Sequence, residues 1–458
     1  MGVLIRAAAL KRLCATALTV LAGAAVAAQP ARSPAITKAL VGGTLVDGFA
    51  GPPIQNSVIL IAGEKIAAVG RVGELAVPQG TEIISTEGMT VLPGLWDMHV
   101  HTMIVGHADY GHWDKAYFTR FESVIMPAAA KQLLSAGVTS ARDLGGPLEQ
   151  SIAVRDRINA GKIPGATLYV SGPFIQHEPY PNTDAYRWGV KGPDDGRAKV
   201  KKIADAGVDV VKLIDQDQMT ADEVRAVVDE AHRHGKPVIA HSHRPEEIRV
   251  GLRAGVDGFE HTGLATAPAY PDDVMAMIRE RTAKMNLGPL FWTPTIEGLL
   301  NYEYFRDHPE ALDDPAWQAD LPAAVVADIK QSLAHVDRLP YFQLTAARRP
   351  TLAHKFKQLR EAGVVQLIGT DSGIPMNFHT HSTWRELDAW VDILGVDPIT
   401  AIRAATYWPS VAMKADARVG TVSAGKDADI IAVRGDALRY IALLQRVDVV
   451  LKRGVRYK

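Results

Sequence analysis

The sequence of 458 residues contains a single cysteine, Cys14. It lies in an apolar stretch near the N-terminus that we expect to be removed from the mature protein. A mature chain without cysteine forms no disulfide and carries no thiol chemistry. Cysteine proteases and zinc sites with cysteine ligands are therefore excluded.

The sequence also lacks an excess of charge of either sign. Lys and Arg total 50, Asp and Glu total 51, and the formal net charge is −1. Without a basic excess to neutralise phosphates, we expect no nucleic-acid partner. Hydrophobic residues make up 47% and charged residues 22%, the balance of a soluble globular protein. The length suits a barrel of about 250–350 residues with a small appendage.

The apolar stretch at the N-terminus has the pattern of a targeting signal. Arg6, Lys11 and Arg12 precede the apolar residues 13–28, which end in the small residues of an Ala-x-Ala pattern. This predicts a cleavable secretory signal over residues 1–28 and a secreted or periplasmic protein. The alternative, a membrane anchor, needs about 20 apolar residues without the small-residue ending. We therefore expect no stable membrane anchor after cleavage.

Two β-rich segments flank a long α/β region. Short apolar or alternating runs over residues 35–91 and 415–458 predict a small β-sandwich domain built from both termini. Residues 92–414 alternate strands with amphipathic helices about eight times, which predicts an α/β fold closed into a (β/α)8 TIM barrel. An open sheet is the alternative. The expected barrel strands are Leu95–Val100, Ser140–Leu144, Leu168–Ser171, Asp209–Ile214, Pro237–Ser242, Gly258–Thr262, Phe291–Ile296 and Val365–Asp371.

Helices and one insertion can be placed within this region. Thr220 and Glu223 predict a capping box at the start of one helix, and another is expected over Pro245–Ala254, ending at Gly255. Residues 297–350 form a long, aromatic-rich segment after the seventh strand. Because an insertion there lies at the face where barrel active sites form, we interpret it as a lid. A dimerisation element is the alternative, which leaves a homo-oligomer open.

Histidines and an aspartate mark the ends of several expected strands. His99 and His101 close the first strand, and a period of two places both imidazoles on one side of it. Three further strands end in His241, His261 and Asp371. Barrel geometry brings such ends together, and imidazole with carboxylate suits Zn²⁺ or a similar ion. The sequence therefore predicts a metal site.

Lys212 occupies an apolar strand, where a bare ammonium group would be costly to bury. Taken alone, it is best explained by pairing with an acid or by reaching solvent. The other interpretation is a carbamate formed with CO₂, an anion whose two oxygens can bridge two cations. The neighbouring candidate ligands favour the carbamate.

Several motifs, in this order, resemble the amidohydrolase superfamily. More narrowly, they are similar to its imidazolonepropionase-like and Xaa-Pro dipeptidase (prolidase-type) branch, which includes ochratoxin-hydrolysing amidohydrolases. The resemblance runs from about Lys38 to the C-terminus. The motifs are LPGLWDMHVH (92–101), GVTSARDLGG (137–146), Lys212, His241, GVDGFEH (255–261), GTDSG (369–373) and GTVSAGKDADI (420–430).

The resemblance implies a centre with two divalent metal ions. Zn²⁺ is the expected metal, with Mn²⁺ and Co²⁺ as alternatives. The ions would share a hydroxide that attacks an amide carbonyl, and Asp371 would serve as the general acid and base. The implied ligands are His99, His101 and Asp371 for the more buried ion, His241 and His261 for the other, and carbamylated Lys212 as the bridge.

Three further histidines, His243, His177 and His381, are expected to face the substrate. His243 follows His241 by two positions and competes for the same place, and we assign the ligand role to His241. The local sequence His-Ser-His-Arg-Pro lacks the acid found in deaminases of the superfamily that use one metal. Residues 215–218, Asp-Gln-Asp-Gln, replace a Gly-rich, Tyr-containing loop often seen in this branch.

These features predict a secreted or periplasmic metal-dependent hydrolase acting on a small molecule. The expected reaction is cleavage of an amide bond in a dipeptide or N-acyl amino acid. The first alternative keeps the site but acts on a lactam, lactone or phosphoester, since a bridging hydroxide attacks any of them. The second alternative, a non-catalytic barrel protein, would require a broken ligand set, whereas every position is filled.

Overall fold

The computed structural model describes residues 35–49, 51–262 and 266–458, and residues 36–458 form one unit. The predicted signal segment, residues 1–28, lies outside the described residues. Within the described part of the chain, no helix is long and apolar enough to cross a membrane.

Two small sheets are built from the ends of this unit. One has the order β4-β3-β1-β5 and the other the order β19-β18-β17-β6-β2, in which C-terminal β17 pairs antiparallel with N-terminal β6. Buried side chains from both sheets, including Ile59 and Ile430, share one hydrophobic cluster. The strands are β1 Lys38–Val41, β2 Thr44–Leu45, β3 Ser57–Ala62, β4 Lys65–Arg71, β5 Glu82–Ser85, β6 Met89–Pro93, β17 Ile430–Arg434, β18 Val449–Lys452 and β19 Val455–Arg456.

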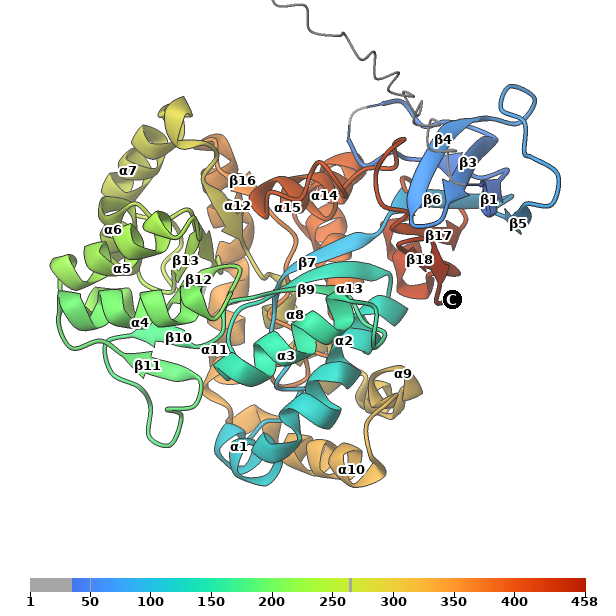
Figure 1. Ribbon diagram of the computed structural model, residues 1–458. Coiled ribbons are helices and arrows are strands. Elements are labelled where there is room, and N and C mark those ends of the chain that lie inside the picture. The colour runs from blue at the N-terminus through green and yellow to red at the C-terminus, as the bar shows by residue number, and fades with distance from the viewer. Residues whose placement is uncertain (1–34, 50, 263–265) are drawn as a thin grey trace, which may run out of the picture. The chain divides into compact units, whose positions relative to one another are not determined.

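Two parallel sheets form the centre of the molecule (Figure 1). One has the order β11-β10-β12-β13-β14-β15-β16, and the other the order β7-β8-β9. An α/β fold with parallel strands is thus confirmed. The strands are β7 Leu95–Val100, β8 Val138–Asp143, β9 Thr167–Val170, β10 Phe174–Gln176, β11 Arg187–Gly189, β12 Val211–Leu213, β13 Val238–His241, β14 Gly258–Glu260, β15 Phe291–Thr293 and β16 Val365–Gln366.

All eight expected central strands are present, but several are shorter than the sequence pattern indicates. β16 ends at Gln366, and the residues beyond it bond to β7: Met98 N donates to Ile368 O at 2.9 Å, and Asp371 N donates to His99 O at 2.7 Å. At the other edge, Asp209 N donates to Val170 O at 2.8 Å. Backbone hydrogen bonds therefore connect both edge strands of the three-stranded sheet to the seven-stranded sheet, near β16 and near the inner strand β12. β10 and β11 were not predicted, because three residues are too few to show alternation.

Helices alternate with these strands, and in Figure 1 α5 and α6 lie outside β12 and β13. The capping box of Thr220 and Glu223 is confirmed, and Gly255 ends α6 in the left-handed region, with φ of 90°. The helices are α1 Tyr110–Tyr117, α2 Met126–Ser135, α3 Leu148–Asn159, α4 Pro193–Asp205, α5 Ala221–Arg233, α6 Pro245–Ala254, α7 Asp272–Ala283, α12 Leu352–Glu361, α13 Ser382–Asp388, α14 Pro398–Ala404 and α15 Tyr407–Ala412.

The segment between β15 and α12 is helical and packs on the central region. Trp317 is fully buried and stacks on Phe378 with ring centroids 4.4 Å apart. α10 lies beside α1 (Figure 1), where Asp328 Oδ2 is 2.9 Å from His112 Nε2. The helices of this segment are α8 Glu297–Asp307, α9 Pro315–Gln318, α10 Ala323–Ser332 and α11 Pro340–Arg348.

Candidate metal centre

The strand ends bring together the histidines and the aspartate that the sequence singles out. The ring of His99, on β7, has its centroid 5.2 Å from that of His101 and 4.9 Å from that of His261. The ring centroid of His261 lies 4.7 Å from that of His241, the last residue of β13. Asp371 Oδ1 is 2.9 Å from His101 Nε2 and 3.4 Å from His99 Nε2. The ends of β7, β13 and β14 and the segment that follows β16 therefore meet around one point.

The buried nitrogens of this cluster supply the observation that tests a metal site. In the described residues, the buried nitrogen atoms of the cluster that lack a hydrogen-bond partner are His99 Nε2, His101 Nδ1, Lys212 Nζ, His241 Nδ1, His243 Nε2 and His261 Nε2. A buried polar atom without a partner is costly, so a set of six in one place indicates a missing binding partner. Imidazoles with a carboxylate are a donor set that fits Zn²⁺. The residues present therefore fit a metal centre.

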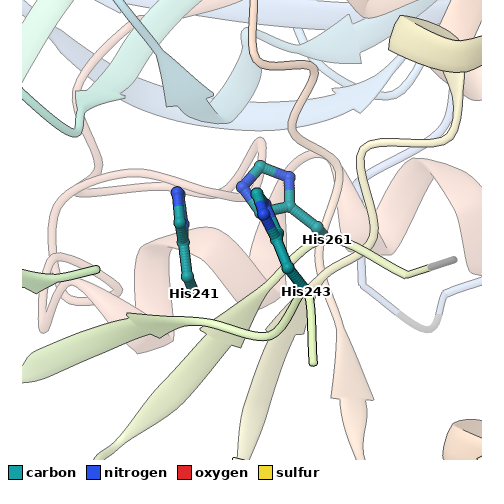
Figure 2. A group of neighbouring side chains, drawn as sticks. All are labelled: His241, His243 and His261. Carbon is teal, nitrogen blue, oxygen red and sulfur yellow. The ribbon is translucent and has the colours of Figure 1, made fainter. Parts of the chain in front are cut away.

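The cluster contains two groups of three residues, and within each group the potential ligand atoms all lie within 4.8 Å of one another. One contains His99, His261 and Asp371, and the other contains His241, His243 and His261. Figure 2 shows the three histidines of the second group projecting to the same side of the strands. The rings of His241 and His243 lie stacked, with centroids 4.4 Å apart. The structure thus places His243 among the candidate ligands as closely as His241.

Burial sets the protonation of these groups. It lowers the pKa of His99, His241 and His261 well below the ordinary value, and the pKa of His243 to about 3. These imidazoles are therefore neutral at neutral pH, the form that binds metal. Burial likewise lowers the pKa of Lys212 to about 8, although Glu260 opposes this shift.

A second layer of polar groups orients the candidate ligands. His99 Nδ1 lies 2.7 Å from Glu260 Oε2, and Arg142 Nη2 lies 2.6 Å from Glu260 Oε1. His261 Nδ1 lies 2.8 Å from Thr295 Oγ1. Hydrogen bonds of this kind fix the ring and its tautomer in metal sites.

Sequence reasoning missed Glu260, although a signal was available. Glu260 is the strand partner of His241, so strand alternation aims it into the interior and should aim His261 away. The left-handed backbone of His261, with φ of 76°, turns its side chain back toward the cluster. Asp371 also has a left-handed backbone, with φ of 62°. Strained residues of this kind gather at functional sites.

The cluster forms one wall of a cavity. The opposite walls are mainly apolar, and their polar groups come from Tyr110, Asp114, Tyr186 and Arg187. The apolar lining consists of Met103, Ile104, Phe174, Ile214, Leu299, Tyr302 and Ile374.

Of the three histidines expected to face the substrate, the structure places only His243 on this cavity. His177 lines a neighbouring cavity together with Trp188. His381 is absent from the lining in the described part of the chain, and its Nε2 lies 2.9 Å from Asp314 Oδ2. Both follow strands in the sequence, but the chain turns away before their side chains reach the cluster.

Comparison with known proteins agrees with this geometry. The Amidohydrolase family matches residues 90–456. Ochratoxinase from Aspergillus niger is 25% identical over 473 aligned positions, which cover 91% of this chain and 85% of the relative. A solved protein from Bifidobacterium longum, provisionally named a prolidase, is 27% identical with a TM-score of 0.70 and coverage of 93% and 96%. The structure of a Xaa-Pro dipeptidase with bound methionine shows the same fold at 24% identity, with a TM-score of 0.70 and coverage of 92% and 99%.

The family match covers most of the chain and includes every residue of the cluster. The resemblance deduced from the motifs is therefore confirmed: this chain belongs to the amidohydrolase family.

Proposed function

We propose that this chain is a metal-dependent hydrolase that cleaves an amide bond in a dipeptide or an N-acyl amino acid. The observation that carries the proposal is a cluster of six buried nitrogens without hydrogen-bond partners and the Asp371 carboxylate, of which four histidines and Asp371 line one cavity. Family membership supports hydrolysis in general. The names of the relatives, ochratoxinase and Xaa-Pro dipeptidase, support an amide as the bond.

The proposal assigns two divalent ions, with Zn²⁺ first, to this cluster. When bound, such ions lower the pKa of water toward neutrality and polarise a carbonyl group. His243 stands beside the ligands on the substrate side in this assignment. The ligands would be His99, His101 and Asp371 for one ion, His241 and His261 for the other, and carbamylated Lys212 between them.

Lys212 fits the role of a bridging residue. Its side chain is fully buried, and its amine has no hydrogen-bond partner. The lowered pKa increases the fraction of Lys212 that is neutral near neutral pH, and the neutral amine is the form that adds to CO₂. Formation of the carbamate joins the amine nitrogen to the carbon of CO₂ and releases one proton.

Asp371 supplies the proton transfer. Its Oδ1 lies at the centre of the cluster, within 3.4 Å of two imidazoles, and also lines the cavity. In the proposed reaction, Asp371 accepts a proton from the attacking water and delivers it to the leaving amine. A residue in this role must lie within hydrogen-bond reach of both groups.

We extend the proposal to the domain architecture expected from the sequence. The hydrogen bonds that join both edges of the three-stranded sheet to the seven-stranded sheet support a closed (β/α)8 barrel over residues 92–414. The shared core of the terminal sheets supports a β-sandwich domain from residues 35–91 and 415–458. Leu299 and Tyr302 on α8 line the cavity, which supports a lid role for residues 297–350. A secreted or periplasmic location rests on the N-terminal sequence alone.

The proposal is tested by metal analysis and a substrate panel. We expect the purified protein to contain up to two divalent ions per chain, to lose activity with a chelator and to regain it with Zn²⁺. The panel compares Xaa-Pro and Xaa-Arg dipeptides and N-acyl-Phe with lactones. Activity that survives complete metal removal, or turnover of lactones alone, would contradict the assignment.

A further inference from the structure

Arg187, on β11, has surroundings that the reaction outlined above does not explain. Its guanidinium carbon lies 4.7 Å from the ring centroid of Phe174 and 4.4 Å from that of Tyr180. Nη1 donates a hydrogen bond of 3.2 Å to Gln176 Oε1. Contact with two aromatic rings holds the planar cation in one orientation at the wall of the cavity.

This cation lacks the acidic partner that comparable arginines have. Arg142 pairs with Glu260, Arg155 with Asp209 and Arg385 with Glu297. Arg187 forms no ion pair with a carboxylate among the described residues, and its buried Nε has no hydrogen-bond partner.

One acid, Asp114, also lines the cavity near Arg187. Its carboxylate accepts a hydrogen bond from the hydroxyl of Tyr186, whose ring centroid lies 5.8 Å from the guanidinium carbon of Arg187. Burial raises the pKa of Asp114, and although the charge of Arg187 opposes this shift, no ion pair joins the two described side chains. A partly buried guanidinium with a free donor is a preferred partner for a carboxylate supplied by a ligand.

The distance from Arg187 to the metal centre limits the length of a ligand that contacts both. Phe174 contacts both: its ring centroid lies 5.9 Å from that of His101 and 4.7 Å from the guanidinium carbon of Arg187. One amino-acid residue spans about 3.5 Å. The two distances place Arg187 within about three residue lengths of His101, so a dipeptide or N-acyl amino acid can extend from an amide at the cluster to an anionic end at Arg187.

We infer that Arg187 is a specificity-determining residue that binds the free carboxylate of the substrate. The inference rests on the proposed amide hydrolysis and deepens it: the substrate class is an acyl amino acid or dipeptide with an unblocked C-terminus. Neutral amides of the same shape are poor ligands, because they leave the buried Nε donor of Arg187 without an acceptor.

The test compares two ligands that differ in this charge, N-acetyl-L-phenylalanine and its methylamide. Binding of both to the metal-loaded protein is measured by calorimetry, and hydrolysis is measured in parallel. We expect the wild type to bind the acid at least about tenfold more tightly than the methylamide. Arg187→Gln should abolish this preference by weakening the acid alone, and Arg187→Lys should keep part of it.

Lys191→Gln serves as the matched control. Lys191 is an exposed cation four positions from Arg187 that lines the neighbouring cavity instead, so its removal changes the local charge without changing the proposed contact. The acid preference should survive in this variant.

Equal binding of the acid and the methylamide by the wild type, or equal weakening of both in Arg187→Gln, would overturn the inference. Absence of hydrolysis with every amide would instead contradict the proposed function, while the binding comparison would still decide the role of Arg187. The methylamide also reports on folding, since a merely structural loss would weaken both ligands.

Discussion

His99 and Glu260 are joined by a contact of 2.7 Å between Nδ1 and Oε2, with both side chains fully buried. The contact leaves His99 Nε2, the other ring nitrogen, facing Asp371. Burial raises the pKa of Glu260 to about 7, and the adjacent Arg142 opposes this shift. Glu260 thus fixes the orientation of the candidate metal ligand His99 by contacting the ring nitrogen that faces away from Asp371.

Glu260→Gln should weaken metal binding while the protein remains folded. Loss of a group that orients a ligand costs about 10- to 100-fold in metal affinity. The affinity is measured by competition with a chromogenic chelator, and folding by circular dichroism. Glu230→Gln is the control, because Glu230, on α5, is also buried but contacts His234 at the end of that helix, away from the cluster. Wild-type affinity in Glu260→Gln would contradict the orienting role.

Asp371→Asn should lower kcat by at least about 100-fold while most of the metal remains bound. The amide keeps an oxygen for a ligand position but cannot carry a proton between water and the leaving amine. Turnover and metal content are measured on the same sample. Retained turnover in the metal-loaded variant would refute the proton-transfer role.

Lys212→Met should have opposite effects on metal content and on the stability of the metal-free chain. Met fills a similar volume without an unpartnered buried amine, so the free energy of unfolding of the chelated protein should rise by about 1–3 kcal/mol. The number of bound ions should fall, because the bridging group is lost. Denaturant titration and metal analysis measure the two effects.

Electron density at Lys212 in the metal-loaded wild type gives a direct check on the same residue. We expect a carbamate on Nζ that contacts both ions. A bare amine, together with a destabilised chelated Lys212→Met, would contradict the bridging role.

Glu297 should make the stability of the protein depend on pH. Both of its carboxylate oxygens are buried without a hydrogen-bond partner, and Oε1 lies 3.6 Å from Arg385 Nε. Burial raises its pKa from 4.5 to about 8, although Arg385 opposes the shift. Between these two values the folded chain holds a proton that the unfolded chain has released, so the contribution of Glu297 to stability falls as pH rises.

Glu297→Gln removes this titration. Its free energy of unfolding, relative to that of the wild type, should therefore increase between about pH 5 and about pH 8. Urea denaturation of both proteins at several pH values measures the difference. A difference that stays constant across this range would show that Glu297 does not titrate there.

The sequence by itself determined the family, eight of the ten central parallel strands and the positions of the candidate ligands along the chain. These features are local: His241 ends an apolar run, Thr220 and Glu223 sit at capping spacing, and Asp371 lies in a short motif. The terminal strands could also be recognised, because alternation and turns are visible within a few residues.

Only the tertiary structure decided which groups surround those ligands. Alternation aims Glu260 inward toward His99, but His261 reaches the same cluster only through its left-handed backbone, a turn that alternation alone cannot predict. Arg187 reaches the cavity through the short pairing of β11 with β10, which leaves no periodic signal. Contacts between residues distant in sequence depend on how strands meet in space, and that information is spread over the whole chain rather than held in any one segment.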